Sequence, residues 1–141
     1  MIVLDTIVIS EAMRPVPNSS VSRWLSGQAP LQLFTTTISL AEILTGVERL
    51  PVGKRRSGLL ETAETMFTRL FAHRIFVFDE GAARAFPEIA VSRRSRGRPI
   101  SLFDAQIAAI ARANGATLAT RDTSDFEECG IRVVNPWEGR R

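Results

Sequence analysis

The feature of this 141-residue sequence that most limits its fold is an alternation of short apolar runs with helical patterns. The runs that we expect to form strands are residues 2–4, 31–36, 75–78, 117–120 and 131–134. The patterns between them predict helices at residues 6–13, 19–26, 39–50, 54–72, 80–91 and 102–114. Strands that alternate with helices favour an α/β domain, spanning residues 1–141, with a parallel sheet and helices on both faces.

Composition narrows the class of protein and the kind of metal site. Hydrophobic residues make up 45% and charged residues 23% of the chain, as in soluble globular proteins. No apolar run approaches the ~20 residues that cross a membrane, and the opening MIVLDT lacks the basic start of a signal peptide. With Cys129 as the only Cys and His73 as the only His, we expect a reducing cytoplasm and no His/Cys zinc site. Any metal would be held mainly by oxygen ligands.

The cationic residues are almost all Arg, and Lys54 is the only Lys in a chain of net charge +3. Arg favours bidentate contacts with phosphate or carboxylate, so nucleic acid or an acidic partner is plausible. A genome-wide bias toward Arg codons explains the same composition equally well. We expect residues 93–98, RRSRGR, to be a basic loop. This loop either binds RNA phosphates or is simply solvated. Its cationic residues are Arg93, Arg94, Arg96 and Arg98.

Four acidic residues stand at comparable points of the expected fold. Asp5 and Asp122 follow strands, while Glu42 and Asp104 lie in the first turns of helices. The carboxyl ends of parallel strands share one edge of a sheet, so we expect these four side chains to meet in one crevice. Asp125, three residues after Asp122, can join or support them.

Each acid also has a purely structural explanation. Ser39 and Glu42 form a capping-box pattern, Ser101 and Asp104 resemble one, and the helix dipole favours any acid in a first turn. Asp5 can be a turn residue, and the acids of the RDTSD loop can be solvated.

The acids are harder to explain together. Two carboxylates ~4 Å apart repel by about 4 kcal/mol at an effective dielectric of 20, so a cluster must take up protons or bind a cation. Mg²⁺ and Mn²⁺ prefer such oxygen ligands, and they suit phosphodiester hydrolysis.

Four segments of the chain resemble the motifs of PIN-domain nucleases. They are LDT at residues 4–6 followed by VIS at 8–10, TTTISLAEILTGV at 35–47, GRPISLFDAQIAAIA at 97–111 and LATRDTSDF at 118–126. The closing VVNPW at 133–137 is similar to the ending of VapC/FitB-type toxins. The resemblance spans the chain with the motifs in the right order and spacing.

The resemblance implies a three-layer α/β/α fold with a mostly parallel, five-stranded sheet. It also implies an Mg²⁺- or Mn²⁺-dependent endoribonuclease of the bacterial cytoplasm, the toxin of a type II toxin–antitoxin pair. Asp5, Glu42, Asp104 and Asp122 match the catalytic acids. Of these, Asp5, Asp104 and Asp122 would hold the metal, and Glu42 would bind it through water and orient or deprotonate the attacking water. Thr6, Thr120 and Asp125 match supporting positions beside the metal.

The expected partners are an RNA substrate, a cognate antitoxin and a second copy of the chain, with DNA reached only through the antitoxin. In-line attack on phosphorus would leave a 5′-phosphate and a 3′-hydroxyl. One residue departs from the family, because Ile7 stands where the first motif usually has Asn. The alternative is therefore a weak or inactive PIN-fold module that binds RNA or antitoxin. A receiver-like signalling domain fits less well. Such a domain has adjacent acids after strand one and a Lys near strand five, whereas this chain has a single acid, Asp5, and its only Lys is Lys54.

Overall fold

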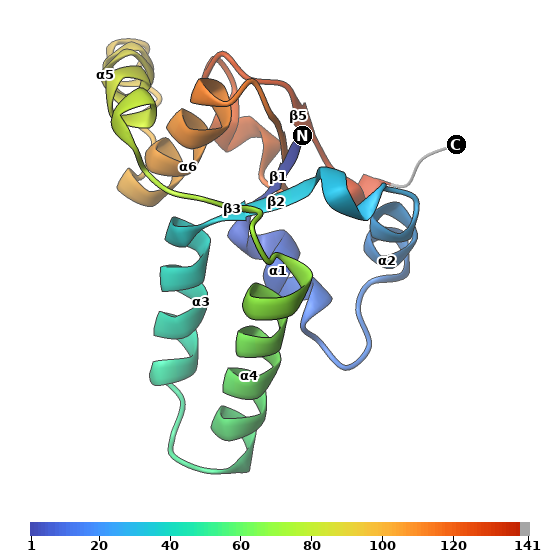
Figure 1. The fold of residues 1–141 in the computed structure, drawn as a ribbon. Coiled ribbons are helices and arrows are strands. Elements are labelled where there is room, and N and C mark those ends of the chain that lie inside the picture. Colours follow the sequence, from blue (N-terminus) through green and yellow to red (C-terminus); the bar gives the residue numbers. More distant parts are fainter. Residues whose placement is uncertain (139–141) are drawn as a thin grey trace.

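The computed structural model describes residues 1–138, in which a five-stranded parallel sheet is covered by helices on both faces (Figure 1). The strands follow the order β3-β2-β1-β4-β5 across the sheet, and every neighbouring pair is parallel. They are β1 (Ile2–Leu4), β2 (Leu33–Thr36), β3 (Ile75–Phe76), β4 (Thr117–Ala119) and β5 (Val133–Val134). The expected three-layer α/β/α class, with five parallel strands, is confirmed.

Six α-helices connect these strands, and α3 and α4 form a hairpin that extends away from the sheet (Figure 1). They are α1 (Thr6–Ala12), α2 (Ser19–Ser26), α3 (Thr37–Glu48), α4 (Lys54–Thr65), α5 (Glu80–Ser95) and α6 (Leu102–Ala113). Shorter segments are η1 (Pro30–Gln32), the π-helical η2 (Met66–Leu70) that prolongs α4, η3 (Thr123–Phe126) and η4 (Pro136–Glu138). Within residues 1–138, no helix is both long and apolar enough to cross a membrane.

Two apolar cores lie on the two faces of the sheet. Successive strand residues point to opposite faces, so Val3 packs with α5 and α6 whereas Leu4 packs with α1, α3 and α4. Leu118 and Ala119 on β4 divide in the same way. Both faces are therefore buried, and the carboxyl edge of the sheet is left for polar residues.

The start of α3 differs from the sequence expectation. Thr36 keeps an extended backbone and caps the helix, because its Oγ1 accepts a hydrogen bond of 3.0 Å from the Ser39 amide. The predicted cap at Ser39 is therefore wrong, and Ser39 is a buried residue inside the first turn. Because α3 begins at Thr37, Glu42 lies in its second turn instead of its first.

The end of α5 also differs from the sequence expectation. The helix continues through Pro87 to Ser95, so the prediction that residues 93–98 form a loop is wrong for its first half. Ile89 and Arg93, both buried, fix this second half of the helix against the rest of the domain. Asp79 caps the start of α5, because its side chain accepts a hydrogen bond from the Ala82 amide. The Ser101 cap expected from the sequence is confirmed by its bond from the Asp104 amide.

Candidate active site

The candidate site lies where the chain reverses its direction of growth across the sheet. β1 and β4 are neighbours, and the chain passes from β1 outward through β2 and β3 before it returns to β4 and β5. Ligands of open α/β sheets bind in the crevice at the carboxyl ends of two such strands. Asp5 follows β1 directly and Thr120 follows β4 directly, so the two ends of the chain meet at this crevice.

Asp5 is a buried carboxylate held by two hydrogen bonds. Its side chain is 5% exposed. Its Oδ1 accepts from the Thr6 amide at 2.8 Å and its Oδ2 from the Thr120 hydroxyl at 2.7 Å. Burial raises the pKa of Asp5 to about 6, against the lowering effect of these bonds, and repulsion from Asp104 and Glu42 adds to the rise. Among residues 1–138, Asp5 has no basic partner within ion-pair distance.

Asp104 stands in the first turn of α6, where Ser101 caps the helix. The Ser101 Oγ accepts from the Asp104 amide at 3.2 Å. Partial burial raises the pKa of Asp104, and repulsion from Glu42, Asp125 and Asp122 acts in the same direction. Asp104 therefore lies within electrostatic reach of the other sequence-predicted acids, although these come from the end of β1, from α3 and from the loop after β4.

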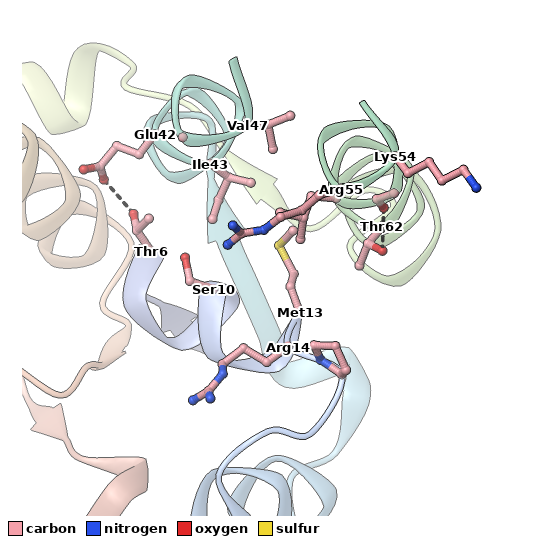
Figure 2. A pocket seen from close by; sticks show the side chains of 14 residues that line it. Thr6, Ser10, Met13, Arg14, Glu42, Ile43, Val47, Lys54, Arg55 and Thr62 are labelled. Carbon is pink, nitrogen blue, oxygen red and sulfur yellow. Dashed lines mark hydrogen bonds between the residues drawn. The ribbon is translucent and has the colours of Figure 1, made fainter. Parts of the chain in front are cut away.

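A chain of hydroxyl groups connects Glu42 to α1 and to the end of β2. Thr6 Oγ1 donates to Glu42 Oε1 at 2.6 Å (Figure 2) and lies 2.9 Å from Ser39 Oγ. A hydroxyl carries one proton, so Ser39 donates to Thr6, and Thr36 donates to Ser39 across 3.4 Å. Ser39, predicted only as a helix cap, is thus part of the site. Its signal was a small polar residue one turn before Glu42 on the same helix face.

The donor set suits a hard divalent cation, but its side chains do not yet surround one. As they stand, no three acidic, His or Cys side chains in the described part of the chain are arranged to hold a metal ion. Glu42 is turned toward Thr6, whereas each Asp5 oxygen accepts one hydrogen bond and keeps a second lone pair for a ligand. The chemistry fits Mg²⁺ or Mn²⁺, because mutually repelling carboxylates offer only oxygen ligands. Binding would have to be accompanied by rotation of acidic side chains.

Thr6 and Thr120 each donate a hydrogen bond to one of the acids, Thr6 to Glu42 and Thr120 to Asp5. Thr120 also accepts from the Asp122 amide at 3.1 Å, which links the loop after β4 to Asp5. Asp122 and Asp125 themselves are exposed. Ile7, the departure from the family motif, lies in α1 and packs against the apolar core on that face.

The basic segment at residues 93–98 is largely occupied by contacts within the protein. Arg93 is 4% exposed and donates to a backbone carbonyl, so neither of the two alternatives, phosphate binding or solvation, holds for this residue. Arg96 and Arg98 form ion pairs with Glu128 and Glu127 respectively. Of the four, only Arg94 is exposed without an ion pair among residues 1–138.

A groove of about 690 Å³ between α1, α3 and α4 begins at Thr6 and Glu42 (Figure 2). Apolar residues such as Met13 and Val47 line its middle. Arg55 points into the groove, whereas the neighbouring Lys54 points away from it (Figure 2). Glu42 therefore lines a channel that holds cationic and apolar side chains together.

A parallel sheet in this strand order, with acids gathered at the β1–β4 crevice, defines an α/β protein of the PIN type. The family model described as PIN domain matches residues 2–131, and the chain belongs to this family.

Three relatives align over almost the whole chain. Plasmid stability protein StbB of Pseudomonas syringae pv. tomato is 46% identical over 138 residues, which cover 98% of this chain and 99% of that protein. VapC ribonuclease Y4jK of Sinorhizobium fredii is 38% identical, with the same coverage of 98% and 99%. Toxin FitB of Neisseria gonorrhoeae is 40% identical, over 97% of this chain and 99% of that protein.

Among solved structures, that of FitAB bound to an IR36 DNA fragment contains a chain similar to this one. It superposes with a TM-score of 0.92 at 39% identity, covering 100% of this chain and 99% of that chain. The chain is thus similar over its full length to proteins named as ribonuclease, toxin and stability protein.

Proposed function

We propose that this protein is an Mg²⁺- or Mn²⁺-dependent endoribonuclease that acts as the toxin of a type II toxin–antitoxin pair. The observation that carries the proposal is the buried carboxylate of Asp5, which has no basic partner among residues 1–138 and is repelled by Asp104 and Glu42. A protein that only bound RNA would gain nothing from carboxylates that repel one another and also repel phosphate. The similarity to VapC ribonuclease Y4jK and toxin FitB supports the same class.

The burial and the hydrogen bonds of the acids suggest different roles for them in metal binding and in activation of water. Asp5, Asp104 and Asp122 would hold the metal directly or through water, and Asp5 is fixed for this role by Thr6 and Thr120. A bound divalent ion supplies charge neutralisation at phosphate and lowers the pKa of a coordinated water. Glu42, placed by Thr6 at the mouth of the groove, would orient the attacking water or accept its proton.

The groove between α1, α3 and α4 gives the substrate a place beside Glu42. A polynucleotide strand fits a channel that combines cations for phosphates with apolar surface for bases. Arg55 and Arg14 supply cations, and Met13 and Val47 supply apolar surface. Cleavage within a strand that extends along such an open groove would make the enzyme an endonuclease.

The partners follow from the toxin assignment. A cognate antitoxin would cover the acidic crevice, and the complex would reach DNA through the antitoxin. A homodimer is proposed as well; a measured mass of one chain in solution would refute it. We place the activity in the bacterial cytoplasm.

RNA cleavage by antitoxin-free protein tests the proposal. We expect Mn²⁺ or Mg²⁺ to support cleavage that leaves 5′-phosphate ends, and EDTA to abolish it. Asp5→Asn and Asp104→Asn should reduce the rate at least 10²-fold, because each removes a charge from the site. Glu61→Gln, an exposed acid on α4, is the charge-matched control and should cleave like wild type.

The alternative is a PIN-fold module that binds RNA or antitoxin without cleaving. Its support was Ile7, but Asp5 is held by Thr6 and Thr120 and not through position 7. Metal-dependent cleavage absent from wild-type protein freed of antitoxin, together with retained RNA binding, would favour this alternative.

A further inference from the structure

Arg93 on α5 is a buried cation without an acidic partner. Its side chain is 4% exposed, and none of the ion pairs in residues 1–138 involves it. Its Nε is buried without a hydrogen-bond partner. Burying a guanidinium in this way is costly, so an apolar residue would serve better if Arg93 only filled space.

The guanidinium of Arg93 instead holds the loop that follows β4. Its Nη1 donates to the Glu127 carbonyl at 2.9 Å and approaches the Ser124 carbonyl at 3.5 Å. Arg98 meets the same loop, because its Nη2 donates to the Ser124 carbonyl at 3.2 Å and its Nη1 to Glu127 Oε1 at 2.8 Å. The Arg98 amide donates to the Arg93 carbonyl at 2.9 Å, so the backbone positions that carry the two side chains are joined.

The loop's own backbone supplies few hydrogen bonds. Within it, the Asp125 amide donates to the Asp122 carbonyl at 3.0 Å and the Glu127 amide to the Ser124 carbonyl at 3.4 Å. Glu128 has a φ of 62°, a left-handed conformation that is unfavourable for residues other than glycine. Arg96 forms an ion pair with the Glu128 carboxylate, which links the side chain of this residue to α5.

We propose that Arg93 is a positioning residue for the candidate active site, whose bonds to the carbonyls of Ser124 and Glu127 set where Asp122 and Asp125 stand relative to Asp104. Asp122 begins this loop and Asp125 lies within it, and both repel Asp104. A displacement of about 1 Å in such a group costs on the order of 10²-fold in rate. The proposal rests on the proposed function for its effect on activity, but not for its effect on the loop.

The loop can be tested in metal-free protein without any activity assay. Arg93→Met removes the hydrogen-bond donors while keeping a side chain of nearly the same length. Arg93→Lys keeps the positive charge but loses the planar guanidinium group. Arg84→Met is the matched control on the exposed face of α5. We expect amide hydrogen exchange at Asp125 and Glu127 to rise roughly 10- to 100-fold in both Arg93 variants. Exchange in the buried part of α6 should stay as in wild type. If Arg93→Met does not fold, Arg93→Lys alone decides.

Activity provides the second readout. In Arg93→Lys, kcat should fall at least tenfold while KM for RNA stays within about twofold. The reason is that a displaced loop shifts Asp122 and Asp125 but leaves the groove between α1, α3 and α4 unchanged. Arg84→Met should match wild type in both constants. Loop exchange that is unchanged in the Arg93 variants, or that rises by the same factor in α6, would overturn the proposal. If wild-type protein does not cleave RNA, the proposed function fails, and the exchange measurement still decides the role of Arg93.

Discussion

Replacing Asp5 by Asn should make the metal-free protein more stable at neutral pH, although it removes a candidate catalytic residue. The native state holds the Asp5 carboxylate in a buried position beside other acids, which raises its pKa from 3.8 to about 6. Native protein therefore binds more protons than unfolded protein between pH 4 and pH 6. Stability from this group is full below pH 4 and is lost as the pH rises through 6.

The size of the effect follows from the two pKa values. The difference between 3.8 and about 6 corresponds to about 3 kcal/mol of native-state destabilisation at pH 7.5. Asn carries no charge and can still accept from the Thr6 amide, but its amide group faces the Thr120 hydroxyl, which must turn its proton elsewhere. That rearrangement costs about 1 kcal/mol. The net gain is about 2 kcal/mol, or roughly 6 °C in melting temperature for a chain of this length.

Urea unfolding with EDTA present, at pH 7.5 and at pH 4, measures this gain. We expect Asp5→Asn to exceed wild type at pH 7.5 and to show no advantage at pH 4. Asp122→Asn, at an exposed position of the same crevice, should differ from wild type by less than about 0.5 kcal/mol. A variant less stable than wild type at pH 7.5, or an equal difference at both pH values, would refute the assigned electrostatic cost at Asp5.

Three further outcomes are expected. Mn²⁺ at 100 times its dissociation constant should stabilise wild type by about 2.7 kcal/mol in thermal melts but leave Asp104→Asn unchanged; equal shifts in both would place the ion elsewhere. Thr36→Ala should cost about 1–2 kcal/mol in urea unfolding, because it removes the cap of α3, and Thr36→Ser should restore most of it. His73→Gly should gain roughly 0.5–1 kcal/mol by relieving a φ of 64° at an exposed position; a loss in urea unfolding would show that the left-handed residue is not strained.

The alternation of apolar runs and helical patterns was enough to predict the sheet, its parallel strands and the edge at which the acids gather. It was not enough to locate the cap of α3. Thr36 and Ser39 are both suitable capping residues, and the choice between them depends on how far β2 remains extended. The point at which β2 ends is set by its pairing with β1 and β3, which local sequence does not encode.

The role of residues 93–98 was harder to predict. A run of Arg beside Gly and Ser is typical of a solvated loop, yet Arg93 is buried by a segment about thirty residues further along the chain. Only the carbonyls of Ser124 and Glu127 explain why a cation is kept there. Ser39 was misjudged for a similar reason, since its partner Thr6 lies on another helix.

The pairing of β1 with β4 has a consequence for synthesis of the protein on the ribosome. Asp5 emerges first, but its partner Thr120 is translated more than a hundred residues later. A nascent chain that stops before β4 has no neighbour for β1 on that side, so it cannot assemble the crevice. Incomplete translation products should therefore lack the proposed cleavage activity, which should begin only when the last two strands have joined the sheet.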